Sequence, residues 1–350
     1  MSSPYASEVF LHRLLGKALA AGASDVHLRV GQPPGARVRG DLVYFRGDKI
    51  LAADTLAAAR LLVGPAGEAR LDAAHEVVFV YEASGVGRFR VTAYRQRGDL
   101  ALVMRALPVK IPTFAELGVP AAVTALAETK QGILIVAGGT GQGKTTTLAA
   151  MVGHLNDSYP RHIVTLEEPI ELWHEDHRGS VSQRSIGEDA VSFASGVRAA
   201  RWLDPDVIVI SDLRDHDTFA AALEAAECGH LIIAAVAAPD VTRAVGRLQA
   251  LGRGVHDLAP RLAASLAGVL AQRLVVKRDG SGVALCSEVL VATAAVREAL
   301  RTPEGSDELA TQLRELMEKG ASPYGMQTFE MSHKQLVSQG VASASLRPPA

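Results

Sequence analysis

Alternation of apolar and polar residues dominates the first third of the chain and predicts short strands there. Apolar residues at helical spacing precede the strands over 7–22, and a second helix is predicted near 53–63. The predicted strands lie at 24–30, 36–39, 42–45, 76–81, 87–94 and 100–106. This mixture indicates a small α+β domain over residues 1–107.

The pattern changes after Pro108 and Pro112, which mark a linker over 108–118. Beyond the linker, predicted helices alternate with short apolar runs at 132–137, 162–167, 206–211 and 230–236. Strands that alternate with helices form a parallel sheet. From Val255 onward the pattern is mainly helical, with one more strand at 283–290. The predicted fold class is therefore α/β, with a second domain over 119–350.

Residues 138–145 match the full pattern of a phosphate-binding loop, Gly-Gly-Thr-Gly-Gln-Gly-Lys-Thr, between a predicted strand and a predicted helix. Backbone N–H groups of such a loop and the N-terminus of the helix surround nucleotide phosphates. Lys144 can reach the β- and γ-phosphates, and the Thr145 hydroxyl can bind Mg²⁺. The predicted ligand is Mg·ATP, held by Gly138, Gly139, Thr140, Gly141, Gln142, Gly143, Lys144, Thr145 and Thr146.

The composition narrows the possible partners and compartments. Of the 350 residues, 48% are hydrophobic, so the chain can bury substantial cores, while a formal net charge of −2 argues against binding to nucleic acid. Cys228 and Cys286 lack metal-ligand spacing and are expected to be core thiols in a reducing compartment. No apolar run approaches the roughly 18–20 residues of a membrane span. We expect a soluble, cytoplasmic protein.

Two acidic clusters follow the phosphate loop at the ends of predicted strands. An ATPase of this class needs one carboxylate for Mg²⁺ and another for the attacking water. Glu167 and Glu171 belong to the first cluster, and Asp212 to the second. Asp212 follows a run of apolar residues, which is the Walker B pattern. Acidic residues at strand ends are also common in ordinary loops, so the phosphate loop upstream gives this interpretation its weight.

Three basic residues are further candidates for the site. His230 stands just before the apolar run of the predicted strand at 230–236, where a histidine is usually structural. Arg90 lies on one predicted strand of the first domain and Arg105 on the next. Arginines on a sheet face are often only solvated, but ring-forming ATPases use such arginines across subunit boundaries.

The chain resembles the secretion-type hexameric ATPases, and among them the PilT-like retraction motors of type IV pili. The resemblance spans residues 23–329. It rests on the phosphate loop together with the segments 23–28, 87–94, 146–151, 167–171, 182–184, 213–215, 225–231 and 325–329.

This resemblance implies an N-terminal PAS-like domain, a RecA-like second domain and a homohexameric ring with ATP between neighbouring domains. It implies that Glu171 orients the attacking water, that Asp212 supports Mg²⁺ and the γ-phosphate, and that His230 is functional. Arg90 and Arg105 match arginine fingers. The implied partners are an inner-membrane pilus platform protein and other pilus motor ATPases, which would bring the protein to the inner face of the cell membrane.

The chain departs from the family pattern at positions that matter for catalysis. Ser211-Asp212 replaces Gly-Glu, Glu168 replaces an Asp, and Ala235-Val-Ala-Ala238 replaces Thr-Leu-His-Thr. Asp is one methylene shorter than Glu, and a displacement of about 1 Å at a catalytic group can cost on the order of 10²-fold in rate. The C-terminal Ala-Ile-Arg-Asn-Leu motif of the retraction motors is only partly matched at residues 294–300. We expect intact nucleotide binding and weak hydrolysis.

Three interpretations stay open from the sequence. The first is a ring-forming pilus ATPase with weak hydrolysis. The second is a non-hydrolysing, ATP-gated regulatory subunit of a pilus motor. The third is a fully competent pilus or type II secretion motor in which Asp212 acts through a bridging water or a small strand shift. A secretion role is weakened because a four-cysteine zinc insertion and a long N-terminal docking region are missing from the sequence.

Overall fold

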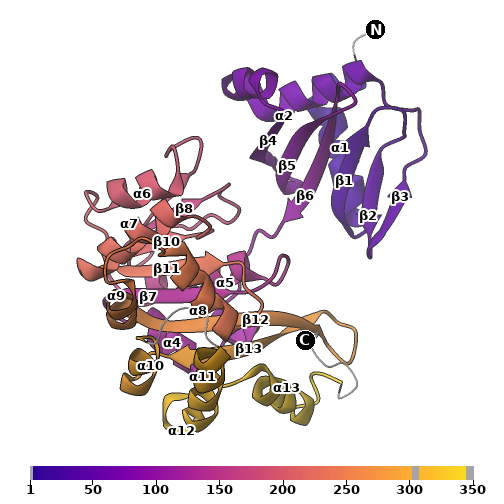
Figure 1. Ribbon diagram of the computed structural model, residues 1–350. Coiled ribbons are helices and arrows are strands. Elements are labelled where there is room, and N and C mark those ends of the chain that lie inside the picture. The colour runs from indigo at the N-terminus through magenta and orange to yellow at the C-terminus, as the bar shows by residue number, and fades with distance from the viewer. Residues whose placement is uncertain (1–2, 302–306, 344–350) are drawn as a thin grey trace. The chain divides into compact units, whose positions relative to one another are not determined.

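The computed structural model describes residues 3–301 and 307–343 and divides the chain into two compact units (Figure 1). Unit 1 comprises residues 1–110 together with the segment Pro169–Leu172, and unit 2 comprises the remainder. The segment expected as a linker over 108–118 is divided between them. Its later part contains a short helix, α3 (Phe114–Leu117), whose N-cap Thr113 accepts a hydrogen bond from the Glu116 N–H.

Unit 1 is built on a six-stranded antiparallel sheet with the order β3-β2-β1-β6-β5-β4. Its strands are β1 (Ala23–Arg29), β2 (Gly35–Val38), β3 (Asp41–Tyr44), β4 (Glu76–Ala83), β5 (Gly87–Gln96) and β6 (Asp99–Leu107). Its helices are η1 (Pro4–Ala6), α1 (Glu8–Ala20) and α2 (Ala52–Ala73). Leu11 and Leu15 of α1 and Ala58 of α2 join buried strand residues in one core.

Helix α2 extends ten residues beyond the helix predicted at 53–63. The apolar pattern stops there because Gly64 has a φ of 68° and Pro65 follows it. Proline lacks the N–H that a helix interior needs, so the two residues kink the helix. A second helical stretch continues after the kink.

Unit 2 holds a seven-stranded sheet with the order β13-β12-β7-β11-β10-β8-β9, in which only the β12–β13 pair is antiparallel. Its strands are β7 (Gly132–Ala137), β8 (His162–Glu167), β9 (Ser180–Ser185), β10 (Val207–Ile210), β11 (Leu231–Val236), β12 (Leu266–Val276) and β13 (Val283–Val291). The parallel sheet expected from the alternating pattern is present.

Helices cover both faces of this sheet (Figure 1). Ile133 and Ile135 of β7 enter one core, and Leu134 and Val136 enter the other, because successive strand residues point to opposite faces. The helices are α3, α4 (Ala121–Ala127), α5 (Lys144–Ser158), α6 (Phe193–Ala200), α7 (His216–Glu227), α8 (Val241–Leu251), α9 (Leu258–Ser265), α10 (Ala294–Ala299), α11 (Asp307–Lys319), α12 (Ala321–Tyr324) and α13 (Phe329–Ser338).

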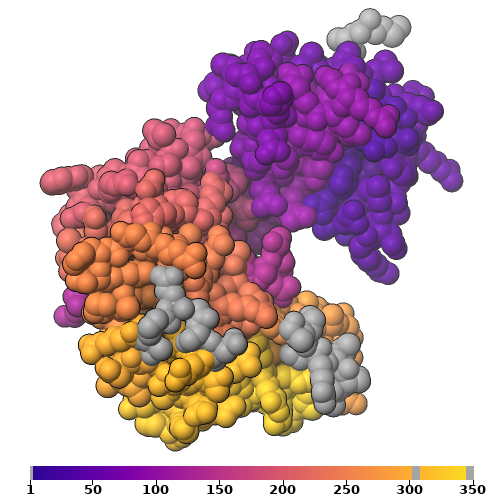
Figure 2. Space-filling view, in the orientation of Figure 1, coloured from indigo at the N-terminus to yellow at the C-terminus, as the bar shows by residue number. Residues whose placement is uncertain are grey.

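The C-terminal helices of unit 2 form a continuous surface with the rest of that unit in Figure 2. Leu313 and Met317 of α11 are fully buried in the same core as the β7 residues Ile133 and Ile135. Among the described residues, no helix is both long and apolar enough to cross a membrane.

Two strands of unit 2 differ from the sequence-based expectation. β12 lies where a mainly helical pattern was predicted. Most of its residues are buried, so it lacks the alternation that identifies a half-exposed strand. β9 is a polar edge strand, and its composition of Ser, Gln and Arg hides it from an apolar pattern.

The two cysteines also differ from expectation. Cys286 is buried in β13, as predicted for a core thiol, but Cys228 is exposed at the end of α7. The Arg201 guanidinium lies 3.4 Å from the Cys228 sulfur.

Candidate nucleotide-binding site

The phosphate loop connects the buried strand β7 to helix α5, as the sequence predicts. Gly141 and Gly143 have φ values of 75° and 83°, which glycine adopts without strain. Gly143 is the N-cap of α5, so the first N–H groups of the helix are free to meet an anion at its N-terminus. The loop therefore has glycine at its two positive-φ positions and leads directly into the N-terminus of α5.

Lys144 lies over this loop. Its ammonium donates hydrogen bonds to the carbonyl oxygens of Gly138 at 2.9 Å and Gly139 at 2.8 Å. Burial lowers the pKa of the ammonium, and the Asp212 carboxylate opposes that effect. A phosphate bound in the loop would be a stronger partner for this cation than two neutral carbonyls.

Asp212 follows strand β10 and faces the loop closely enough to interact electrostatically with Lys144. Its carboxylate is 3.6 Å from Arg214 Nη1, and Arg214 Nη2 donates to Glu168 at 2.6 Å. Burial raises the pKa of the Asp212 carboxyl, while Arg214 and Lys144 lower it and Glu168 raises it. The structure thus brings together the loop lysine and the predicted Walker B carboxylate.

Glu167 ends the neighbouring strand β8 and is held in place by polar contacts. Its Oε1 accepts hydrogen bonds from Thr165 Oγ1 at 2.7 Å and from Gln183 Nε2 of β9 at 2.9 Å. Since β8 and β10 are parallel neighbours, Glu167 and Asp212 both lie at the carboxyl edge of the sheet. That edge is where open α/β sheets bind ligands.

His230 is not part of this edge. It precedes β11, whose first residue Leu231 pairs with Gly132 at the amino end of β7, whereas the phosphate loop follows the carboxyl end. Its Nδ1 lies 2.8 Å from the Pro205 carbonyl oxygen. The structure does not bring His230 to the phosphate loop, because the length of a strand separates them. Its contacts are those of a residue that fastens a loop.

The predicted arginines lie in unit 1, where each has an acidic partner. Arg90 Nη1 donates to Glu171 Oε1 at 2.6 Å, and Arg105 Nε donates to Asp25 Oδ1 at 2.8 Å. Glu171 belongs to the segment that packs with unit 1, and its carbonyl accepts a bond from Arg88. Arg90 and Arg105 are paired directly across β5 and β6. Like charges in that position repel, and the two carboxylates offset the repulsion.

The pKa of Asp25 reflects this pairing. Burial of the Asp25 carboxyl opposes its ionisation, but hydrogen bonds from Arg105 and Ser24 outweigh burial, and the net effect lowers its pKa. Asp25 is buried, so its charge depends on these partners. Sequence reasoning included Asp25 only within the segment 23–28 that carries the resemblance, and it did not predict the pairing with Arg105.

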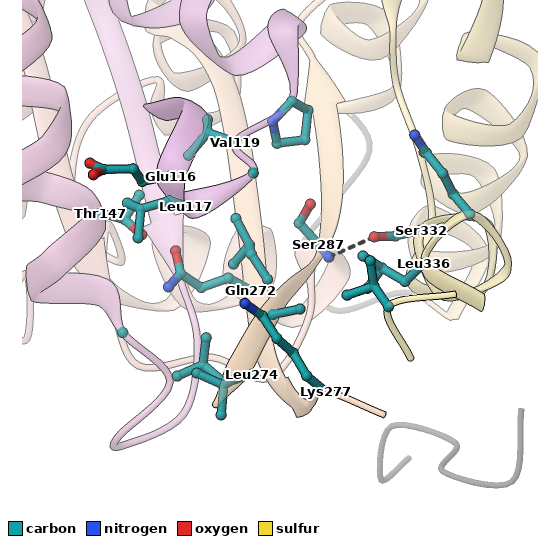
Figure 3. A pocket seen from close by; sticks show the side chains of 18 of the residues that line it. Glu116, Leu117, Val119, Thr147, Gln272, Leu274, Lys277, Ser287, Ser332 and Leu336 are labelled. Atoms are coloured by element: carbon teal, nitrogen blue, oxygen red, sulfur yellow. Dashed lines mark hydrogen bonds between the residues drawn. The ribbon is translucent and has the colours of Figure 1, made fainter. Parts of the chain in front are cut away.

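A cavity of about 630 Å³ adjoins the phosphate loop within unit 2 (Figure 3). Its lining includes Thr147 of α5, Leu117 and Val119 from the α3–α4 region, Leu274 of β12 and Leu336 of α13. This volume lies in the range of small-molecule sites, and mixed apolar walls with a few polar groups are typical of them.

The polar groups of the cavity stand among these apolar walls. Gln272 lies on β12, Ser287 on β13 and Ser332 on α13. The Ser332 hydroxyl accepts a hydrogen bond from the Ser287 N–H at 3.1 Å (Figure 3). Sequence reasoning missed the cavity because its lining is drawn from segments between 115 and 341. No local motif marks them.

Comparisons with known proteins agree with this geometry. The family described as "Type II/IV secretion system protein" matches residues 4–322. The type IV pilus retraction ATPase PilT of Pseudomonas aeruginosa is 33% identical over 332 residues, which is 94% of this chain and 94% of that protein. The type IV pilus ATPase PilU of the same organism is 35% identical over 337 residues, covering 94% of this chain and 85% of that protein.

A solved structure of the pilus retraction motor PilT with bound ADP is also similar. It has a TM-score of 0.84 and 32% sequence identity, and the match covers 96% of this chain and 95% of that chain. The Legionella pneumophila ATPase DotB has a TM-score of 0.79 at 26% identity, with coverage of 97% and 95%.

The chain therefore belongs to the type II/IV secretion system protein family. Within it, the chain is a PilT-like P-loop ATPase of the type IV pilus motor class, with the α/β fold of that group. The predicted family and fold class are confirmed.

Proposed function

We propose that this chain is a ring-forming subunit of a type IV pilus machine that binds Mg·ATP well and hydrolyses it slowly. The observation that carries the proposal is that the chain combines a complete phosphate loop with Asp212 at the Walker B position, where the family has the longer Glu. The electrostatic interaction between Lys144 and Asp212, at the edge of the sheet where the loop lies, supports a shared role in binding Mg·ATP. The shorter carboxylate weakens the chemical step.

The reaction is attack of water on the γ-phosphorus of ATP, which breaks the bond to the β-phosphate oxygen and releases ADP and phosphate. Lys144 and the loop N–H groups stabilise the phosphate charge. Mg²⁺, when bound, neutralises charge on the phosphate oxygens. Thr145 and Asp212 would hold it, and oxygen donors of this kind suit Mg²⁺.

Glu171 is the proposed residue that orients the attacking water. In the structure its carboxylate is bound by Arg90. Arg90 and Arg105 are the proposed arginine fingers, acting on the nucleotide of a neighbouring subunit. Each arginine must first leave its carboxylate partner within unit 1 before it can reach that nucleotide. Because the nucleotide belongs to a neighbouring subunit, hydrolysis in this proposal requires an assembled ring.

The cavity beside the loop is the proposed site for the adenine and ribose. Leu117, Val119 and Leu274 offer apolar surface for the base, and Thr147 links this cavity to the helix that carries the phosphates. The size of the cavity supports an occupant of nucleoside dimensions.

The proposed partners follow from the pilus relatives. They are further copies of this chain, an inner-membrane platform protein and other pilus motor ATPases. The proposed location is the cytoplasm, at the inner face of the membrane.

The test is steady-state ATP hydrolysis by the unmodified protein beside Asp212→Glu, with Lys144→Ala as the inactive control. We expect wild-type turnover below the roughly 1–100 s⁻¹ of typical phosphoryl-transfer enzymes, and a clear gain for Asp212→Glu. Wild-type turnover within that range, with no gain for Asp212→Glu, would favour a fully competent motor instead.

A regulatory, non-hydrolysing subunit is the second candidate. The replacement of the Thr-Leu-His-Thr segment by Ala235-Val-Ala-Ala238, at the end of β11, favours it. This candidate predicts tight Mg·ATP binding by the wild type and undetectable hydrolysis even in Asp212→Glu. The same assay separates it from the slow motor.

A further inference from the structure

Strand β12 is longer than its neighbour β7, and the difference falls beside the phosphate loop. The two strands pair as far as Ala271 and Ala137, where β7 ends and the chain enters the loop. β12 continues to Val276, paired on its other edge with β13. Its backbone groups that face the loop therefore have no strand beside them. Buried N–H groups without a partner are costly, so another group is needed there.

Gln142, in the middle of the loop, supplies that group. Its side-chain Oε1 accepts a hydrogen bond from the backbone N–H of Leu274 at 2.7 Å. Its backbone carbonyl accepts a second bond, from the side-chain Nε2 of Gln272, at 2.6 Å. Gln272 is 1% exposed, so the second bond is shielded from water. One loop residue is thus attached to β12 at two points.

Both ends of the loop also pack against this stretch of β12. A Cβ added to Gly138 would lie 3.0 Å from the backbone oxygen of Gln272. A Cβ added to Gly143 would lie 3.3 Å from Gln272 Nε2 and 3.6 Å from Leu274 Cδ1. The start, the middle and the end of the loop therefore all lie close against β12.

We propose that Gln142 is a positioning residue for nucleotide binding and hydrolysis, because it holds the phosphate loop on β12 in the conformation that receives phosphates. The proposal rests on the nucleotide site described above. The side-chain oxygen of Gln142 is engaged with Leu274, so Gln142 acts through the loop backbone and not by touching the phosphates. Lys144 can then leave the carbonyls of Gly138 and Gly139 without a change in the shape of the loop.

The same strand stretch links the loop to the proposed base site. Gln272 and Leu274 line the cavity as well as holding Gln142. The two ends of a bound nucleotide would therefore rest on one rigid strand. Weakening the attachment of Gln142 should reduce the affinity for ADP as well as ATP, because the loop N–H groups that hold the shared phosphates lose their fixed arrangement.

The test uses the full chain and three variants. Gln142→Met removes the acceptor at nearly constant volume, Gln142→Glu keeps an acceptor oxygen, and Gln312→Met is a matched change at an exposed glutamine of α11. Hydrogen exchange at the Leu274 amide is measured without nucleotide, and Mg·ADP affinity is measured by calorimetry. Thermal unfolding shows whether each variant folds.

We expect Gln142→Met to speed exchange at Leu274 and to raise the Kd for Mg·ADP about fivefold, the effect of one neutral hydrogen bond. Gln142→Glu should keep the protection of Leu274, and Gln312→Met should match the wild type in both measurements. If Gln142→Met does not fold, Gln272→Met removes the other attachment and should raise the Kd similarly.

Two results would overturn the proposal. Unchanged exchange at Leu274 in Gln142→Met would mean that the bond does not hold the strand. Faster exchange with an unchanged Kd would mean that the attachment exists but does not position the loop. Failure of the unmodified protein to bind Mg·ADP is a separate result, which would refute the proposed nucleotide site together with this role for Gln142.

Discussion

Glu171 and Asp212 are the two carboxylates whose separate removal distinguishes water activation from support of Mg²⁺. We expect Glu171→Gln to lower single-turnover ATP cleavage at least about tenfold, a loss of about 1.4 kcal/mol of transition-state stabilisation. Asp212→Asn should cost less, because Asp212 is already too short for full effect. Nucleotide affinity should change little in Glu171→Gln, since Lys144 and the loop supply it.

The ranking of the two losses decides the assignment. A larger loss for Asp212→Asn than for Glu171→Gln would reverse the two roles. Unchanged cleavage in both variants would mean that neither carboxylate contributes to the chemical step.

Asp25 gives unit 1 a dependence on pH. Its pKa in the folded state is lowered below the usual 3.8, so the ion pair with Arg105 stabilises the fold above that pH. This stabilisation should be lost as the pH falls through the lower, folded-state pKa. Asp25→Asn should cost about 1.5–3 kcal/mol at neutral pH, the worth of a charged hydrogen bond. Chemical denaturation at pH 7 and at pH 3 measures both effects.

The reason for this prediction can be checked in the same series. The difference in the free energy of unfolding between the wild type and Asp25→Asn should narrow as the pH falls, because Asp25 of the wild type loses its charge. A constant difference at all pH values would indicate that packing, and not the ion pair, carries the stability.

Individual residues of the site differ in how well sequence predicts them. The phosphate loop could be located because its function depends on consecutive residues. Asp212 could be located because a buried strand delivers it to a sheet edge. Gln272 and the cavity could not, because their neighbours come from distant segments. His230 precedes its strand, whereas the phosphate loop follows a parallel neighbour, so the two lie at opposite edges of the sheet. The role of His230 was taken from the family resemblance and stays a prediction.

At the level of elements, the burial of a strand determined whether its pattern of apolar and polar residues could identify it. Strands of unit 1 alternate because their sheet has one polar face, and they were predicted within a few residues. β7 and β11 are apolar throughout, and their short length between turns identified them. β12 is also mostly buried but follows α9 without a turn signal, so its pattern merges with the helix before it.

Packing between α4 and β12 depends on a single glycine. A Cβ at Gly268 would lie 2.5 Å from Leu126 Cδ1 of α4 and 2.7 Å from the Leu290 backbone oxygen. Gly268→Ala should therefore destabilise the protein by about 1–3 kcal/mol, the usual cost of overpacking a core. The midpoint of chemical denaturation measures the loss.

Gly246 of α8 provides the matched control, because a Cβ added there meets nothing within 4 Å apart from its chain neighbours and the backbone of its own helix. Gly246→Ala should raise stability by up to about 1 kcal/mol, since alanine favours the helix. Equal stability of Gly268→Ala and the wild type would show that α4 can move away from β12 at little cost.

For the whole molecule, the distribution of the proposed site predicts assembly. The phosphate loop belongs to unit 2, while Arg90 and Arg105 belong to unit 1 and are bound to carboxylates there. If these arginines serve a neighbour, nucleotide should promote a ring. Sedimentation velocity with a non-hydrolysable Mg·ATP analogue should show a species well above the monomer. A strict monomer at micromolar concentration with nucleotide bound would contradict this.

The two thiols of the chain offer a direct way to count subunits. Cys228 is exposed at the end of α7, whereas Cys286 is buried in β13. A maleimide dye should therefore attach once per chain, in the turn before β11, without an engineered cysteine. Under single-molecule illumination, each assembly would then bleach in as many steps as it has labelled subunits. The unequal burial of the two thiols thus allows the copies of this chain in an assembly to be counted.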